Sequence, residues 1–423
     1  MKTRSTFFSK FLSKGRSCVF LCLALSSCAT YQNKVHDSRL LLEQGQYEQA
    51  IEKLKPLAEK ADGDQLVYLL DYATALQMSG RYDESNRAFL KADQLSEALD
   101  YHSVTRITGA ALTGEEAVQY KGDTFERTFI NAFLALNFLQ MGKLDDALVE
   151  ARRINEKYLK LRGEDKKSYE LNPFAKYLSA LIWEADQKWD DAYIAYQEAY
   201  KLDPSIPSLR EDLIRSAKRA QRETDLAKWK KEFPDIKEDP LWSNRKAGEL
   251  VIIYLQGWGP RKQPSEASFR IPTLRAVPSH TQSLKLQISG LDKKIEEKSS
   301  RLVYNVNDAA IATLQDDAAA LIARRIGSAI VKDQVAQEIR KKNELLGALA
   351  LVAMHVSDRA DLRQWSTMPA TIQVIRKTLP PGKYDFSLQG LSYGDQPTAD
   401  RLENQSVEIK SNRKKFILFR TLR

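Results

Sequence analysis

The chain has 423 residues, which allows two or three domains. Its formal charge is +9 at pH 7, but residues 1–27 hold five basic residues and no acidic one, so residues 28–423 carry only +4. So small a surplus argues against a nucleic-acid partner. The three cysteines all lie within the first 28 residues, which excludes a disulfide framework and a thiolate metal site from the rest of the chain.

A short apolar run follows a basic N-terminus. Lys and Arg at positions 2, 4, 10, 14 and 16 precede about eight apolar residues at 18–25, and the run ends in Leu25-Ser26-Ser27-Cys28. A run of this length is far below the roughly 20 residues that a membrane-spanning helix needs. The segment resembles a bacterial lipoprotein signal peptide. The alternative is an ordinary secretory signal in which the cysteine is incidental.

The resemblance to lipoproteins implies where the protein is held. Cleavage of the signal peptide, residues 1–27, would leave Cys28 as the first residue of the mature chain and the carrier of the lipid. Inserted lipid chains anchor a protein without any spanning segment. Ala29 stands where an inner-membrane retention signal usually has Asp. We therefore expect anchorage through Cys28 to the outer membrane, on its periplasmic side.

Four short segments repeat one pattern: Gly45–Ile51, Gly80–Ser85, Gly142–Leu148 and Gln187–Tyr193. In each, Gly or Gln ends one helix, an aromatic residue or Leu follows, and Ala or Ser lets the next helix approach closely. The first two are 35 residues apart, close to the 34-residue period of the tetratricopeptide repeat, which the pattern resembles. Longer later spacings place insertions near residues 95–124 and 156–172. A generic helical bundle with similar turns is the alternative.

The repeats predict an all-α domain over residues 28–240, closed by capping helices within residues 207–233. By analogy with known repeats, its inner helices would line a binding groove. A further candidate segment lies in the first insertion, because inserted loops on a solenoid often carry binding groups. Its alternative is folding back onto the repeats. The candidate partner-binding residues from the groove and the insertion are Gln77, Tyr120, Phe125, Glu126, Asn131, Phe174 and Tyr177.

The hydrophobic period changes after residues 234–240 from helical to strand-like. Alternating or continuous apolar stretches predict strands near residues 250–255, 284–288, 301–306, 371–375, 384–388, 407–409 and 416–419. The last four strands follow one another through turn signals, which is typical of an antiparallel meander. A β-rich domain over residues 245–423, built as a small β-sandwich, is therefore expected.

A helical segment from about residue 308 to residue 355 interrupts the predicted strands. Ile322, Ile326 and Ile330 are four residues apart, and Asn307 or Asp308 can cap the start. The tail at residues 345–354 is strongly apolar but too short to span a bilayer. We interpret it as buried against the sheet, with membrane contact as the alternative. The fold class is then α+β and multidomain, with a tetratricopeptide-like solenoid followed by a β-sandwich-like domain that carries a long inserted helical segment.

Three further motifs give a more specific resemblance. Residues 120–126 (YKGDTFE), 149–155 (VEARRIN) and 361–370 (DLRQWSTMPA) are similar to segments of an uncharacterised family of bacterial outer-membrane lipoproteins. The likeness runs over most of the mature chain. It implies the order of lipid anchor, tetratricopeptide-like repeats and β-rich C-terminal domain, and it implies no catalytic activity.

The motif residues also have a purely structural interpretation, which we favour. Arg363 lies two residues after Asp361 and is expected to pair with it, while the Trp365 indole is expected to cover the edge of the sheet. Glu150 and Arg153 are three apart on a repeat helix and are expected to form a pair worth about 0.2–0.5 kcal/mol.

Little in the sequence points to catalysis. The four histidines, at positions 36, 102, 280 and 355, show no metal-ligand spacing and no neighbouring nucleophile. Gly257-Trp258-Gly259-Pro260 ends a strand without opening a helix, so it is not a phosphate-binding loop. We therefore expect no enzyme activity, no catalytic residues, no cofactor and no metal site.

The functional expectation is a lipid-anchored periplasmic scaffold whose helical-repeat groove binds other, unidentified envelope proteins. The alternative is a module in the β-domain that binds peptidoglycan or polysaccharide and supports envelope assembly, with Trp258 or Trp365 presenting an aromatic face. A third hypothesis, an envelope hydrolase, would require a cleft of converging carboxylates.

Overall fold

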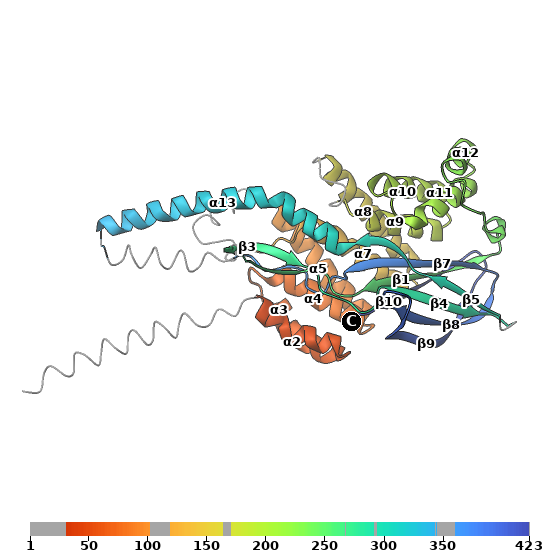
Figure 1. The fold of residues 1–423 in the computed structure, drawn as a ribbon, viewed down its shortest axis with the longest axis horizontal. Helices are drawn as coiled ribbons and strands as arrows, with labels where there is room; N and C mark the ends of the chain where they lie inside the picture. Colours follow the sequence, from red (N-terminus) through yellow and green to blue (C-terminus); the bar gives the residue numbers. More distant parts are fainter. Residues whose placement is uncertain are drawn as a thin grey trace, which may run out of the picture.

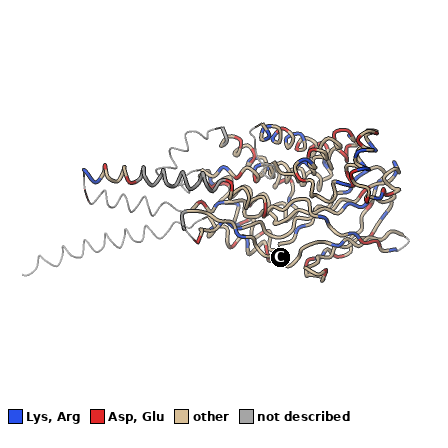
Figure 2. The backbone as a smooth tube through the Cα atoms, turned by 45° about the horizontal axis from the view of Figure 1, so that its top comes forward, with Lys and Arg blue, Asp and Glu red and all other residues tan. Residues whose placement is uncertain are grey.

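The computed structural model describes residues 31–101, 119–163, 171–266, 268–291, 294–342, 344 and 360–422. The predicted signal peptide, Cys28 and the predicted apolar tail at residues 345–354 lie outside the described residues. No helix within these ranges is long and apolar enough to cross a membrane. Lys and Arg alternate with Asp and Glu along the described elements (Figure 2), in keeping with the small net charge.

The N-terminal half consists of consecutive pairs of packed helices, which is a tetratricopeptide-like repeat arrangement. Within the described residues the pairs are α2 with α3, α4 with α5, α7 with α8, α9 with α10, and α11 with α12. Their bounds are Tyr31–Glu43, Tyr47–Glu59, Gln65–Met78, Tyr82–Tyr101, Thr124–Gln140, Leu144–Gly163, Pro173–Ala185, Trp189–Leu202, Pro207–Arg219 and Glu223–Glu232. The predicted capping helices are α11 and α12.

The turn inside each predicted repeat has the expected left-handed residue. Gly45, Gly80 and Gly142 have φ angles of 74°, 80° and 71°, which glycine adopts without steric cost, and Gln187 takes the same position with a φ of 62°. Gln221 repeats it between α11 and α12 with a φ of 58°. The small residues that follow the turns are fully buried where the helices cross: Ala50, Ser85, Ala147 and Ala192.

The C-terminal half contains two four-stranded sheets. The first has the order β10-β1-β7-β6 and the second the order β5-β4-β8-β9, while β2 and β3 form a separate hairpin. The strand bounds are β1 Gly248–Gln256, β2 Arg261–Ser265, β3 Ser268–Arg275, β4 Ser283–Ser289, β5 Ile295–Ser299, β6 Arg301–Asn305, β7 Thr371–Leu379, β8 Gly382–Leu391, β9 Pro397–Ile409 and β10 Lys414–Arg420.

Strand β1 lies at the centre of the molecule, because both of its faces are buried. Leu250, Ile252 and Tyr254 pack in one hydrophobic cluster with residues of β4, β8 and β9. The alternate residues, including Val251 and Ile253, belong to the large cluster that continues through the repeat helices. Figure 1 shows this layering, with α9 and α10 on one side of β1 and β7, and with β4, β8 and β9 on the other.

The predicted C-terminal meander is wrong. Strand β7 lies in the first sheet, β8 and β9 lie in the second, and β10 returns to the first sheet, where it pairs in parallel with β1 from Glu249↔Lys414 to Leu255↔Arg420. Hydrophobic alternation marks which residues face a core, but it does not specify the pairing partner. Hairpin β2–β3 and strand β5 carry mostly polar residues and were not predicted.

Two further elements connect the halves of the chain or extend from them. A 3-10 helix, η2 (Pro240–Ser243), occupies the predicted boundary between the domains. Helix α13 (Val306–Lys342) lies between β6 and β7 in the chain, and Figure 1 shows it projecting away from the body of the molecule. It begins two residues before the expected start at Asp308, whose side chain accepts a hydrogen bond from Asn305.

Candidate functional site

The side of the repeat array formed by α4, α5 and α7 is filled by the chain's own segment 360–370, which we call the strap. Trp365 of the strap is 1% exposed, and its ring centroid lies 5.0 Å from that of Phe133 and 5.6 Å from that of Phe89. Its indole Nε1 donates to the Thr74 hydroxyl at 3.0 Å. Trp365 therefore inserts between the repeat helices. The prediction that it covers the edge of the sheet is wrong.

A buried carboxylate on α4 holds the strap in place. Asp71, which is fully buried, accepts hydrogen bonds from the hydroxyls of Ser366 and Thr367, each at 2.9 Å, and from the Thr367 backbone N–H at 3.0 Å. The Tyr31 hydroxyl donates to it at 2.6 Å. Burial raises the pKa of Asp71 although these hydrogen bonds oppose the shift.

Glu126 at the start of α7 binds the strap from the other side. One carboxylate oxygen accepts the Trp365 backbone N–H at 2.8 Å, and the other accepts the Tyr120 hydroxyl. Glu126 also forms a capping box with Asp123, so the YKGDTFE motif both starts the helix and fixes the strap. Burial, helped by the nearby Asp123 charge, raises the pKa of Glu126 to about 7 against the opposing effects of Lys262 and the Tyr120 hydroxyl.

Arg363 completes the attachment of the strap. Its guanidinium pairs with Asp361 at 2.7 Å, as predicted, and also with Asp64 near the start of α4 at 2.9 Å. It lies over the Tyr120 ring, 5.5 Å from the centroid. Two of the sequence motifs, residues 120–126 and 361–370, are therefore the two halves of one intramolecular interface.

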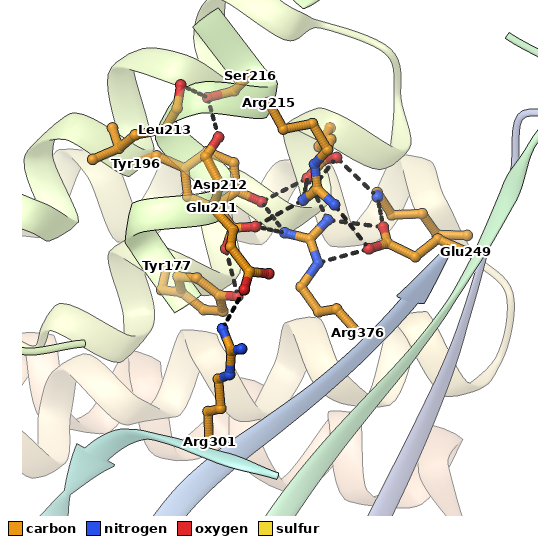
Figure 3. A network of polar contacts seen from close by, with 12 residues as sticks. Tyr177, Tyr196, Glu211, Asp212, Leu213, Arg215, Ser216, Glu249, Arg301 and Arg376 are labelled. Carbon is orange, nitrogen blue, oxygen red and sulfur yellow. Dashed lines mark hydrogen bonds and ion pairs between the residues drawn. The ribbon is translucent and has the colours of Figure 1, made fainter. Parts of the chain in front are cut away.

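A second buried polar cluster joins the halves of the molecule near α9 and α11 (Figure 3). Arg376 on β7 uses all five of its N–H donors. It donates twice to Glu249 of β1, and once each to Asp212 of α11, Glu184 of α9 and the Tyr196 hydroxyl of α10, in every case at 2.8 Å. One side chain from the sheet is thereby bonded to three repeat helices.

Two further cations complete the cluster around Arg376. Arg215 of α11 contacts Asp212 at 2.8 Å and Glu249 at 3.1 Å. Lys414 of β10 contacts Glu184 at 3.1 Å and also pairs with Glu249. Three acidic and three basic side chains, drawn from both halves of the chain, thus neutralise one another away from solvent.

The electrostatics of this cluster follow from its charge balance. Burial alone would raise the pKa of Glu184, but the charges of Arg215, Arg376 and Lys414 outweigh it and lower that pKa to about 2. The pKa of Glu249 is likewise lowered, against burial, by Arg376 and Lys414. These carboxylates are therefore ionised at neutral pH, which is the state that the ion pairs require.

The seven predicted partner-binding residues all lie in the interior of the described structure. Their exposed fractions range from 0% to 5%. Gln77 donates to Asn137, Asn131 donates to Glu150, and Tyr177 donates to Asp212. Phe129 packs between Phe174 and the Tyr304 ring of β6. A groove open to solvent is therefore absent at these residues, and a partner would reach them only after the strap or β6 had moved. A role in partner binding stays a prediction for all seven residues, which are Gln77, Tyr120, Phe125, Glu126, Asn131, Phe174 and Tyr177.

Two other expectations concern aromatic rings and ion pairs. Trp258 and Trp365 are 2% and 1% exposed, so neither presents a ring face to a glycan in this structure. The predicted pair of Glu150 and Arg153 is present at 3.5 Å. Among the described residues, no group of three or more His, Cys, Asp or Glu side chains is arranged to hold a metal ion.

Sequence reasoning missed the residues that build the two buried clusters. Asp71 lies in the apolar stretch of α4, Glu184 in that of α9, and Arg376 directly after Val374 and Ile375 of β7. A charge inside a largely apolar element is costly unless it is paired. Such charges were the available signal for an interface between two buried surfaces.

Comparison with known proteins gives only distant likenesses. No family model matches the chain, and no curated protein matches it. The MamA RS-1 ArsTM double mutant is 18% identical over 47% of this chain and 90% of its own, with a TM-score of 0.32. MamA 41-end from Desulfovibrio magneticus RS-1 is 19% identical over 47% and 89%, with a TM-score of 0.30.

A third solved structure belongs to a Podosopora anserina protein described as a kinesin light chain with TPR-like repeats. It is 12% identical over 48% of this chain and 93% of its own, with a TM-score of 0.34. Likenesses at these identities and TM-scores carry no information about the function of this chain. The repeat arrangement rests on the helix pairs and their left-handed turns.

Replacing Arg376 by Met is expected to destabilise the protein strongly. The substitution removes five hydrogen bonds and leaves three buried carboxylates with two cations, so we expect a loss of about 3–5 kcal/mol in the free energy of unfolding. Urea unfolding followed by tryptophan fluorescence measures it. The matched control is Arg401→Met on β9, whose side chain is 64% exposed, with an expected change below about 0.5 kcal/mol. Similar losses in both variants would contradict the role of Arg376.

Glu126 is expected to make stability depend on pH. Because its pKa is raised to about 7 in the folded protein, its contribution is fully present below the unfolded value near 4.5 and is lost as pH rises through 7. We expect the melting temperature of the wild type to fall between pH 5 and pH 8, by an amount that corresponds to about 1–3 kcal/mol. In Glu126→Gln, which cannot ionise, this part of the dependence should vanish. Parallel pH profiles of wild type and variant would refute the assignment.

Proposed function

We propose that the protein is a lipid-anchored scaffold on the periplasmic side of the outer membrane, which binds other envelope proteins through its helical repeats. The lipid anchor at Cys28 is supported by the signal-peptide pattern in the sequence. The binding role is supported by the array of helix pairs, since such arrays offer extended preformed surfaces that need little ordering on binding.

Because the groove is filled, we place partner binding on a different face of the repeats. Because the strap and β6 cover the side of α4, α7 and α9 that a tetratricopeptide-like array would otherwise offer, partners meet the second helix of each pair first. These helices carry solvent-exposed apolar side chains, namely Val149 and Leu159 of α8 and Ile194 of α10, with exposed fractions of 41%, 53% and 41%. The observation that carries this step is the burial of the predicted groove residues by the repeat helices, the strap and β6.

The glycan-binding alternative gains no support from the aromatic residues on which it depended. Trp258 and Trp365 are both buried, and Trp365 serves the interior of the repeat array. The scaffold is therefore the function that the geometry favours.

Removing the acceptor of the lipid tests the anchor. Cys28→Ala is expected to move the protein from the membrane fraction to the soluble periplasmic fraction, because each buried methylene of the lost lipid contributes about 0.8 kcal/mol to membrane binding. Fractionation with immunoblotting, together with intact-mass measurement of the N-terminus, gives the readout. Cys22→Ala, which changes a cysteine within the expected signal peptide, is the matched control and should leave anchorage intact. A Cys28→Ala protein that stays in the membrane fraction would refute the anchor.

Photo-crosslinking in intact cells tests which surface binds. A photoreactive residue at Val149 on α8 is expected to form adducts with other envelope proteins, whereas one at the buried Phe174 should form at least about tenfold fewer. Ile295 on β5, which is 63% exposed, reports on the β-domain. Adducts concentrated at Phe174 would mean that the groove opens, and adducts concentrated at Ile295 would move binding to the β-domain. Either result would overturn the outer-face proposal.

A further inference from the structure

A cavity of about 200 Å³ lies next to the cluster around Arg376. It is bounded by α11, by the segment that follows α12, and by strands β5, β6 and β7. Its floor is buried, since Asp212, Glu249 and Arg376 line it, while Lys237 and Ser299 at its rim are exposed. A small solute can therefore enter from solvent and reach the charged floor. The volume is below the roughly 300–1,000 Å³ of sites for drug-sized ligands, so the occupant must be small.

The acidic groups of the cavity wall are already satisfied by partners within the protein. Glu211 pairs with Arg301 at 2.7 Å, and Asp239 accepts the backbone N–H of Leu241 at 2.8 Å. Asp212 and Glu249 are paired with the cations of the cluster. None of these carboxylates therefore requires a cation from solution.

Two donors in the same wall lack such partners. Lys298 of β5 is half-buried, and its ammonium group forms no ion pair or hydrogen bond with any residue that the structure describes. Burial lowers the pKa of Lys298, although Glu211 and Glu249 partly offset this effect. The Nε–H of Arg215, a side chain that is 9% exposed, is buried without an acceptor among the described residues. Of the two, only Lys298 is partly exposed to solvent, so it is the donor that an acceptor bound in the cavity would satisfy.

From these observations we propose that the cavity binds a phosphate group. Ser208 and Ser299 line the wall together with Lys298, so hydroxyl and ammonium donors border one small space. A phosphate has more acceptor sites than a carboxylate and is a dianion near neutral pH, which suits several donors in a space of this size. The occupant is either free phosphate or the phosphate of a small monoester, because the rim leaves an opening for an attached group.

Isothermal titration calorimetry on the purified protein tests the site. Inorganic phosphate, glycerol 3-phosphate and acetate are titrated separately at matched ionic strength. We expect saturable binding of at least one phosphate compound and much weaker binding of acetate. Tighter binding of the monoester identifies a phosphorylated small molecule as the source of the phosphate, and tighter binding of inorganic phosphate identifies the free ion. No saturable binding, or acetate binding as tight as that of both phosphate compounds, would overturn the proposal.

Variants connect the binding to this cavity. Lys298→Gln is expected to weaken phosphate binding about tenfold, because it removes a charged hydrogen bond. Lys55→Gln on α3, where the lysine is 57% exposed and distant in the fold, makes the same charge change and should have no effect. If Lys298→Gln does not fold, Ser299→Ala at the exposed rim should weaken binding about threefold. Unchanged affinity in the folded Lys298→Gln or Ser299→Ala protein would place the binding elsewhere and refute the site.

Discussion

The mutual neutralisation of charges around Arg376 is the constraint on which the arrangement of the two halves depends. Without Arg376 and Lys414 of the sheet, the buried Glu184 and Asp212 of the repeats would share the single cation Arg215. Glu249 of the sheet would in turn lose its pairing with Arg215. Buried ion pairs often contribute little net stability compared with apolar packing. What they do impose is position, since each carboxylate is satisfied only when sheet and helices meet in one register. The hydrophobic cluster shared by both halves then supplies the favourable free energy of docking.

At the other end of the interface, the strap is likewise held in position by buried polar contacts. Asp71 and Glu126 are fixed hydrogen-bond acceptors on α4 and α7. The strap supplies two hydroxyls and a backbone N–H to Asp71 and a backbone N–H to Glu126. In this respect the repeat array already holds a segment of its own chain as it would hold a peptide from a partner. The protein therefore differs from a simple solenoid, because its most enclosed surface is used to hold its own β-domain. What remains for other molecules is the outer face of the helices and the cavity beside β5.

Much of the architecture was accessible from local sequence patterns, while the contacts between distant elements were not. The repeat turns at Gly45, Gly80, Gly142 and Gln187 were predictable because the left-handed backbone favours particular residues. Most strands were predictable from alternation. The parallel pairing of β10 with β1 was not, since nothing local encodes a partner more than 150 residues away. The pairing of Arg363 with Asp361 was expected because the residues are only two positions apart in the chain, whereas the contacts of Trp365 with Thr74 and of Arg376 with Glu184 depend on the assembled fold.

The position of β10 has a consequence for biosynthesis. Strand β1 is bordered by β7 and β10, and the Thr421 carbonyl accepts the backbone N–H of Gly257 beyond its end. A nascent polypeptide therefore emerges with its most apolar strand lacking one neighbour until β10 has been translated. Termination before β10 would expose an unpaired edge of high β-propensity, which is a template for aggregation. Quality control of this protein thus has a simple physical criterion, because only a chain that includes β10 can complete the sheet around β1.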